Sequence, residues 1–333
     1  MIALPPCQKG RKIIMPYLNK KIKTIFIGAS SFGVPALKAL IQDDQFDIIA
    51  IITQPDKKAG RKQIITPSPV KKEAIKNNIP VLQPVKISDA ISEILNFKPD
   101  IIIVAAYAQI IPQSILNIPQ YGCVNIHGSL LPKYRGASCV QAAVLNGDKE
   151  TGVTIMKMDA GLDTGPVLAQ KSIKILAGDT SGVLYTKLAD LGAESLIMAL
   201  KSYIAGELRP IEQDSSSSNL VKELKKEDGR IDWEKPAVEI ERFIRAMSPW
   251  PNAFASFKIK NKISKIKIIE TELQVLNINN FEAGNFFLYK NKLAAQCGQN
   301  ALIIKRLQLE GKKEISAEEF LRGYKNYIGS QIV

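Results

Sequence analysis

The sequence predicts an α/β fold: a doubly wound, Rossmann-like parallel sheet in the larger N-terminal part, then a smaller C-terminal β-barrel. Apolar, strand-like runs alternate with helix-like segments as far as Gly206, and short β runs separated by Asn and Gly follow Ala253. The chain has 333 residues, whereas a single hydrophobic core rarely grows past ~250. We therefore expect two domains, each with its own core.

Apolar runs mark the strands of the N-terminal sheet. Residues 23–28 are a short β-type run, and residues 47–53 and 100–105 are apolar on both faces, as strands covered on both sides are. Further strands are expected at 122–127, 153–158 and 167–175. Helices are expected at 34–41, at 69–78, at 88–97 with Ser88 as its cap, and from Thr180 or Ser181 to Gly206, with a break near Gly192.

The composition changes after Gly206. Residues 207–232 contain a serine run and mixed charges, which are typical of a linker. Residues 237–248 predict an amphipathic helix because Ile240, Phe243, Ile244 and Met247 recur at helical spacing. Short β runs at 256–259, 265–270, 286–289 and 301–307 then predict the barrel. We expect a disordered basic extension at 1–22, a first domain at 23–206, a linker at 207–232 and a second domain at 233–333.

Charge and cysteine content bound the function. The net charge of +13 favours a polyanionic partner, and the densest basic stretch after the N-terminus includes Lys57, Lys58, Arg61 and Lys62. The four cysteines are scattered and the chain has one histidine, so we expect no metal site, reduced thiols and a cytoplasmic protein. No apolar run approaches the ~20 residues of a membrane span, so no membrane partner is expected.

The most informative stretch is Val124 to Pro132. Side chains at i and i+2 of a strand share a face, so Asn125 and His127 project together from a strand's carboxyl end, where doubly wound sheets bind ligands. Asp163 follows in a glycine-flanked loop. An amide, an imidazole and a carboxylate suit a tetrahedral intermediate. Two other interpretations stay open: a hydrogen-bonded strand-end pair, and an Asp163 that caps its own loop.

Longer motifs resemble the folate-dependent formyltransferase family. They are Asn125-Ile-His127-Gly-Ser-Leu-Leu-Pro132, Tyr134-Arg-Gly136, Glu150-Thr-Gly-Val-Thr154 and Gly161-Leu-Asp163-Thr-Gly165. Segments at 53–56, 59–61, 67–69, 230–233, 244–246 and 249–251 resemble the members that act on methionyl initiator tRNA. The resemblance runs from Lys23 to the C-terminus and implies an OB-like, tRNA-binding barrel at 233–333.

The resemblance implies a role for each motif. Asn125, His127 and Asp163 would be catalytic, with His127 as acid/base, and 10-formyltetrahydrofolate would be the formyl donor. The implied folate-binding residues are Tyr107, Ser129, Leu130, Leu131, Pro132, Asp159 and Gly161. The implied tRNA-binding residues are Lys57, Lys58, Arg61 and Lys62. A monomer is the family expectation. The alternatives are formyl transfer to glycinamide ribonucleotide or an amino sugar nucleotide, and a non-catalytic RNA-binding protein.

The chain departs from the family pattern at three places. Ala29-Ser30-Ser31 replaces the usual Thr-Pro-Asp after Gly28, Ala108 stands where glycine is usual, and Cys139 replaces a proline. These departures leave the three implied catalytic residues in place, but they bear on the neighbouring pockets.

Overall fold

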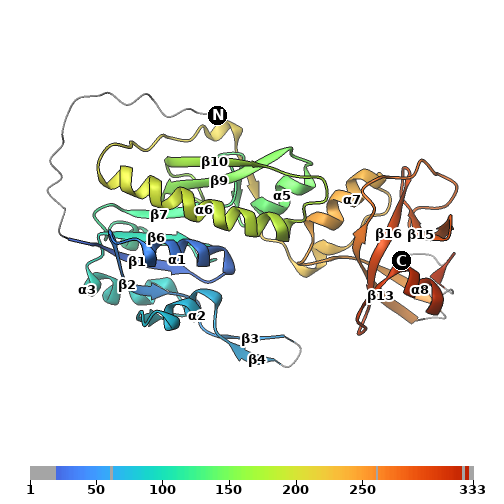
Figure 1. Ribbon diagram of the computed structural model, residues 1–333, viewed down its shortest axis with the longest axis horizontal. Coiled ribbons are helices and arrows are strands. Elements are labelled where there is room, and N and C mark those ends of the chain that lie inside the picture. The colour runs from blue at the N-terminus through green and yellow to red at the C-terminus, as the bar shows by residue number, and fades with distance from the viewer. Residues whose placement is uncertain (1–19, 61–62, 260–261, 325–326, 330–333) are drawn as a thin grey trace.

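The computed structural model describes residues 20–60, 63–259, 262–324 and 327–329. The N-terminal part of the chain forms a sheet flanked by helices, and the C-terminal part forms a separate group of antiparallel strands (Figure 1). Within the described residues, no helix has the length and apolar content needed to cross a membrane. The extension expected at 1–22 lies outside the described residues except for its last three.

A seven-stranded sheet forms the N-terminal half, in the order β10-β9-β7-β6-β1-β2-β5. Its strands are β1 (Ile22–Gly28), β2 (Phe46–Ile52), β5 (Val81–Leu82), β6 (Ile101–Ala105), β7 (Cys123–His127), β9 (Glu150–Lys157) and β10 (Val167–Lys174). The strands from β5 to β7 are parallel, but β9 is antiparallel to both of its neighbours. The expected all-parallel sheet is therefore corrected at this edge. The chain stays at the carboxyl end of β7 and enters β9 from that same end.

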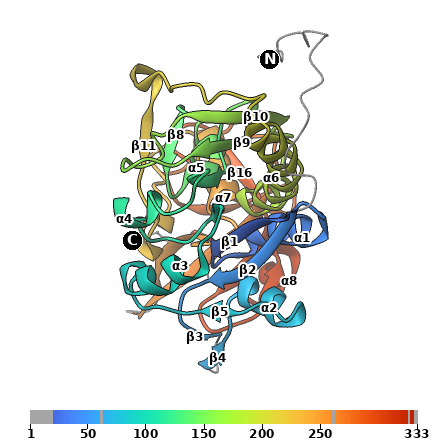
Figure 2. The same cartoon turned by 90° about the vertical axis from the view of Figure 1, so that its left-hand side faces the viewer.

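Helices cover both faces of this sheet (Figure 2). They are α1 (Val34–Gln42), α2 (Pro69–Lys76), α3 (Ile91–Phe97), α4 (Gln113–Leu116), α5 (Cys139–Leu145) and α6 (Ser181–Ile204), with 3₁₀ turns η1 (Ser31–Gly33) and η2 (Ile87–Ala90). Successive residues of β1 enter different cores, because Phe26 packs in one apolar cluster while Ile25 and Ile27 pack in another. This alternation confirms the doubly wound arrangement predicted from strands that are apolar on both faces.

Two predicted helix details are wrong. Ser88 does not cap a helix, since it lies inside η2, and α3 begins only at Ile91. The helix from Thr180 is not broken near Gly192, because α6 runs uninterrupted from Ser181 to Ile204 with the Thr180 hydroxyl accepting from Val183 N. A Cβ on Gly192 would lie 2.8 Å from Ile126 Cγ2 of β7. The glycine therefore lets the helix lie close to the sheet.

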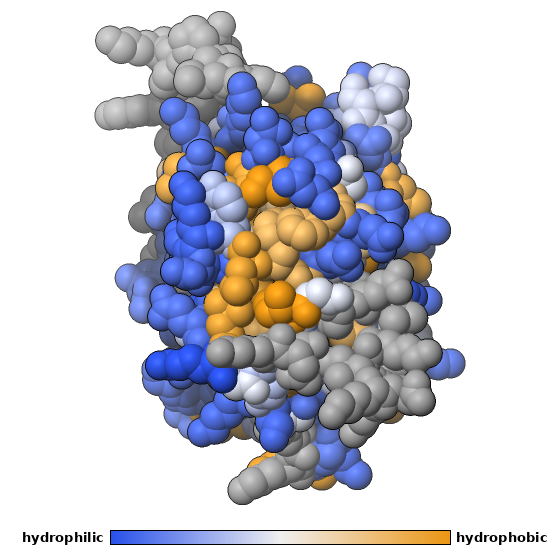
Figure 3. All heavy atoms as spheres, turned by 90° about the vertical axis from the view of Figure 1, so that its right-hand side faces the viewer, coloured by the Kyte–Doolittle hydropathy of each residue, from blue (hydrophilic) through white to orange (hydrophobic). Residues whose placement is uncertain are grey.

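The C-terminal half is an antiparallel sheet in the order β12-β13-β16-β15-β14, with β17 paired to β16. Its elements are α7 (Ala237–Ala246), β12 (Ala253–Ile259), β13 (Lys262–Thr271), β14 (Phe286–Tyr289), β15 (Lys292–Gln296), β16 (Ala301–Leu309), β17 (Glu314–Ser316) and α8 (Ala317–Gly323). The rings of Phe257 in β12 and Phe286 in β14 are 4.8 Å apart although these strands end the sheet. The sheet is therefore curled like a barrel. Its end face is mostly hydrophilic around a central apolar area (Figure 3).

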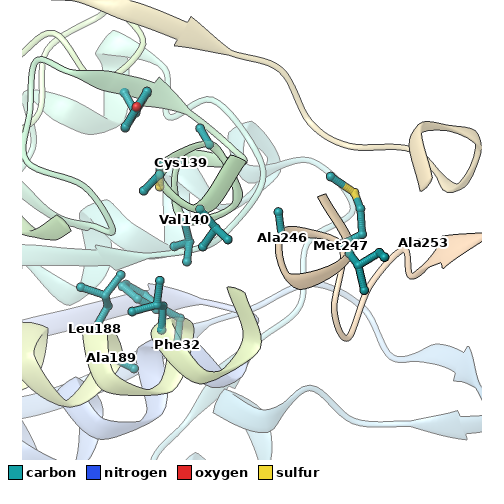
Figure 4. Packing of buried hydrophobic residues seen from close by; sticks show 14 of the residues in the cluster. Phe32, Cys139, Val140, Leu188, Ala189, Ala246, Met247 and Ala253 are labelled. Carbon is teal, nitrogen blue, oxygen red and sulfur yellow. The ribbon is translucent and has the colours of Figure 1, made fainter. Parts of the chain in front are cut away.

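One of the apolar clusters extends through both halves, so the expectation that each domain has a core of its own is wrong. A single cluster of buried apolar residues runs from the α1–α6 face of the first sheet through α5 and α7 into the barrel. Val140 of α5 lies close to Phe32 and Leu188, and Met247 at the end of α7 lies near Ala253 (Figure 4). The core is continuous because α7 packs against both α5 and β13.

Residues between α6 and α7 are not a free tether. They form η3 (Ser215–Ser217), β11 (Asn219–Val221) and η4 (Lys226–Gly229). Strand β11 pairs in parallel with β8 (Tyr134–Gly136), which follows the Asn125–Pro132 motif. A second small pair, β3 (Lys57–Ala59) and β4 (Ile64–Thr66), forms a hairpin that extends from the opposite edge of the domain (Figures 1 and 2).

Candidate active site

Strand β7 presents Asn125 and His127 on one face at the carboxyl edge of the sheet. The strand lies between β6 and β9, with Asn125 opposite Met156 and His127 opposite Thr154. Both side chains are buried, with residue exposures of 9% and 6%. The Asn125 amide makes no hydrogen bond to any residue the structure describes, so its N–H groups remain available to a ligand. The interpretation as a mutually satisfied strand-end pair is therefore not supported.

The His127 ring lies between two oxygen acceptors. Its Nε2 is 2.8 Å from the carbonyl oxygen of Tyr134, and its Nδ1 is 3.5 Å from Oδ2 of Asp163. The same Asp163 oxygen accepts a 2.8 Å hydrogen bond from Gly136 N. The structure thus brings together the three residues that were predicted to be catalytic, and both ring nitrogens face groups that can only accept a proton.

This environment favours the imidazolium form of His127. Burial by itself lowers the pKa of the ring, but the neighbouring Cys139 thiol, the Asp163 carboxylate and the Tyr134 carbonyl outweigh burial and raise the pKa from 6.5 to about 9. Cys139 is itself buried, at the start of α5. The site therefore holds a positive charge at neutral pH, which suits stabilisation of a developing oxyanion.

The loop that carries Asp163 is held by a different carboxylate. Asp159 Oδ1 accepts from Gly161 N at 3.0 Å and from Thr164 Oγ1 at 2.7 Å. Asp163 makes no hydrogen bond of this local kind within the described residues, and its φ is +54°. The interpretation of Asp163 as a loop cap is therefore wrong for its side chain, which points away from its own loop to Gly136 and His127.

The segment after His127 is fixed by buried polar contacts. Ser129 Oγ donates to the Tyr134 carbonyl at 2.9 Å, and Leu131 N donates to Thr154 Oγ1 at 3.0 Å. Ser129 and Leu131 are buried, whereas Leu130 and Pro132 are half-buried. The Ser129 hydroxyl therefore organises the turn, and among these four predicted folate contacts it is the side chains of Leu130 and Pro132 that remain partly accessible.

Tyr107 lies just beyond the carboxyl end of β6, next to β7. Its side chain is buried, its hydroxyl has no hydrogen-bond partner among the described residues, and burial raises its pKa. The residues on either side, Ala106 and Ala108, have φ of +47° and +62°. The glycine usual in the family at position 108 is explained by this left-handed backbone, which Ala108 adopts at a steric cost.

Two of the predicted tRNA-binding residues, Lys57 and Lys58, make no contact with the His127 cluster. Lys57 and Lys58 are exposed on β3 of the projecting hairpin, whereas Arg61 and Lys62 lie outside the described residues. Lys71, from the same basic stretch, instead forms a 2.7 Å ion pair with Asp56.

Four residues at the site were missed as functional candidates. Tyr134 and Cys139 contact or influence His127, Gly136 contacts Asp163, and Gln213 contacts the Asp163 loop from the segment predicted as a linker. Tyr134 and Gly136 make these contacts through main-chain atoms. Every residue has such atoms, so the residue type does not reveal their role. A signal for Gly136 was available, because a glycine in the loop that follows a strand end often marks a close approach of the backbone to another group.

Comparison with known proteins defines the class. Residues 20–200 match the formyl transferase family, and residues 223–325 match the formyl transferase C-terminal domain. The chain therefore belongs to the formyl transferase family.

Similar sequences within the family share one activity in name. The chain is 42% identical to the methionyl-tRNA formyltransferase of Lachnospira eligens, over 91% of this chain and 96% of that one. It is 41% identical to that of Myxococcus xanthus, over 93% and 97% of the two chains.

Solved structures share the fold at lower identity. An N-formyltransferase from Helicobacter canadensis gives a TM-score of 0.61 at 22% identity, covering 85% of this chain and 98% of that one. HypX from Aquifex aeolicus gives 0.59 at 17% identity, covering 93% of this chain and 50% of that one.

Proposed function

We propose that this chain transfers the formyl group of 10-formyltetrahydrofolate to the α-amino group of methionyl initiator tRNA. The activity follows the relatives of about 40% identity that extend over more than nine tenths of the chain. The observation that carries the catalytic assignment is the contact of His127 with both Asp163 and the Tyr134 carbonyl, beside the free amide of Asn125. We further propose a cytoplasmic monomer.

The reaction needs the protein to stabilise an oxyanion, to transfer a proton and to orient the group that transfers it. The neutral α-amino nitrogen attacks the formyl carbon, and the formyl oxygen becomes an oxyanion. Asn125 N–H and the imidazolium of His127 stabilise that charge. The C–N10 bond then breaks, and a proton from the attacking nitrogen reaches N10 of the folate through His127, directly or by way of water. Asp163 keeps the ring protonated and oriented while this proton moves.

A buried polar group without a hydrogen-bond partner among the described residues supports folate binding at this site. A pteridine ring carries several hydrogen-bond donors and acceptors, and it requires protein groups that are not already hydrogen-bonded. The Tyr107 hydroxyl, buried and without a partner among the described residues, is one such group, on a residue that follows β6. Leu130 and Pro132 supply partly accessible apolar surface, and the Met158–Asp163 loop lies at the end of β9.

The test combines one variant with a choice of acceptors. Asp163→Asn preserves the shape of the side chain but removes its charge, so the formyl transfer rate should fall by ~10² or more. The assay follows labelled formyl from 10-formyltetrahydrofolate into charged initiator tRNA, a glycinamide ribonucleotide or an amino sugar nucleotide. Label in tRNA alone is expected. Wild-type turnover by the variant would disprove the role of Asp163, and label in a small amine would disprove the acceptor.

A further inference from the structure

The segment from Ile211 to Val221, here called the strap, pairs with two parts of the candidate active site: the start of β10, which follows the Asp163 loop, and strand β8. At one end, Ile211 and Val167 exchange two backbone hydrogen bonds of 2.9 and 2.7 Å. At the other end, β11 pairs with β8, the strand whose Tyr134 carbonyl accepts from His127 and whose Gly136 N–H donates to Asp163. The strap lies between the two stretches that match the formyl transferase family, 20–200 and 223–325.

Within the strap, the Gln213 side chain connects the Asp163 loop to Arg135 of β8. Its Nε2 donates to the carbonyls of Asp163 at 2.9 Å and Gly165 at 2.7 Å. Its Oε1 accepts from Nε and Nη2 of Arg135 at 3.2 and 2.9 Å. The orientation of the amide is unambiguous, because a guanidinium can only donate and carbonyls can only accept.

The hydrogen bonds of the Arg135 guanidinium come from the strap. This residue lies between Tyr134 and Gly136, is only 7% exposed, and forms no ion pair with a described residue. Its hydrogen-bond acceptors are Gln213 Oε1 and, at 3.2 Å, Ser215 Oγ. A buried charge without such acceptors would be costly, so the contact fixes Arg135 and the strap together.

The Asp163 loop also needs an external support. Asp163 has a φ of +54°, a region that non-glycine residues occupy at a steric cost and keep only when the surroundings hold them there. Gln213 supplies two hydrogen bonds to this part of the loop, one on each side of Thr164. No other described side chain donates to the carbonyls of Asp163 or Gly165.

We propose that Gln213 is a positioning residue for formyl transfer: it sets the position of Asp163 relative to His127 while Arg135 holds its amide in the required orientation. This inference rests on the catalytic role proposed for Asp163. Gln213 then supports the catalytic centre from outside residues 23–206, and a catalytic domain that ends at Gly206 lacks this support.

The experiment is a double-mutant cycle in the full-length chain. Gln213→Ala removes both sets of contacts, and Gln213→Glu keeps an acceptor for Arg135 but loses the donor to the loop. Each should lower kcat by about 10-fold or more, since small misplacements of catalytic groups cost rate steeply, with KM for folate and tRNA nearly unchanged. Ile211→Ala is the matched control, because this side chain of the strap is exposed and only its main chain pairs.

The cycle separates the two proposals. If Gln213 acts through Asp163, adding Gln213→Ala to Asp163→Asn should cause no further decrease in kcat. Decreases that multiply would overturn the positioning role, as would wild-type kcat in Gln213→Glu. If Asp163→Asn alone kept full turnover, the catalytic assignment itself would fail, whatever Gln213 does.

Discussion

At the scale of single residues, the charge on His127 is the property that most constrains the chemistry. The ring faces the Asp163 carboxylate and the Tyr134 carbonyl, and its pKa is raised to about 9. The resting site therefore contains an imidazolium at neutral pH. In the proposed reaction this imidazolium stabilises the oxyanion at once, and it takes up the proton of the attacking amine only as it gives its own to the folate.

The raised pKa of His127 predicts how the stability of the protein depends on pH. A folded-state pKa above the unfolded value of 6.5 stabilises the protein fully below pH 6.5, and this contribution is lost as pH rises through about 9. The unfolding free energy of wild type minus that of His127→Gln should therefore fall between pH 6 and pH 10, by up to ~3 kcal/mol.

Urea unfolding of both proteins at several pH values measures this difference. The comparison is clean because His127 is the only histidine, so no other imidazole titrates in the window. Lysines, and the cysteines that do not interact with His127, titrate alike in both proteins and cancel in the difference, whereas Cys139 interacts with the ring and is part of the measured effect. A free-energy difference that stays constant with pH would contradict the imidazolium assignment.

At the scale of secondary-structure elements, α6 and β7 are joined by close packing beneath the site. Gly192 of α6 lies against Ile126, whose two neighbours in β7 are Asn125 and His127. Ile126 is β-branched and stiff at χ1, so it cannot easily move aside. The long helix therefore supports β7 from the face opposite to the side chains of Asn125 and His127.

Gly192→Ala should destabilise the protein even though alanine favours helices. The added Cβ would lie 2.8 Å from Ile126 Cγ2, and overpacking of this kind typically costs about 1–3 kcal/mol. Thermal unfolding measures the destabilisation, and kcat should fall as β7 shifts. Gly323→Ala at the end of α8 is the matched control, because its Cβ would meet no atom of the described residues within 4 Å. A higher melting temperature for Gly192→Ala would refute the close contact.

At the scale of the whole molecule, the chain combines a continuous core with a basic surface. The barrel is joined to the catalytic half through α7, and Ser181 Oγ at the start of α6 lies 2.7 Å from the carbonyl oxygens of both Ala246 and Ser248, which share its one hydrogen. The net charge is +13, and the hairpin of β3 and β4 carries exposed lysines away from the sheet. We propose that tRNA contacts this hairpin while its acceptor end reaches His127.

Replacing both Lys57 and Lys58 with alanine should weaken the apparent affinity for methionyl initiator tRNA and leave the folate KM unchanged. The salt dependence of tRNA binding should fall by about one unit of slope for each phosphate that the protein no longer neutralises. Lys171→Ala is the control, because this exposed lysine on β10 pairs with Glu194. Equal tRNA affinity and salt dependence in the double variant would remove these lysines from the proposed interface.

Local sequence pattern predicted most of the fold. Strands that are apolar on both faces implied a covered sheet, helical spacing located α1, α2 and α7, and the i, i+2 spacing placed Asn125 and His127 on one face. These features depend on the periodicity of apolar residues, which can be read directly from the sequence. Short elements such as β5, β15, β17, α4, α5 and α8 were not predicted, because their apolar runs are too brief to show a periodicity.

The sequence by itself therefore determined the order of elements, the family, and a site built on Asn125, His127 and Asp163. Tertiary structure alone decided the antiparallel entry of β9, the unbroken helix at Gly192, the shared core, and the partners of His127 and Asp163. The reason is physical: Tyr134 and Gly136 act through backbone atoms, and Gln213 reaches Asp163 across fifty residues of chain. Contacts of that kind arise from packing between distant segments, which no local pattern encodes.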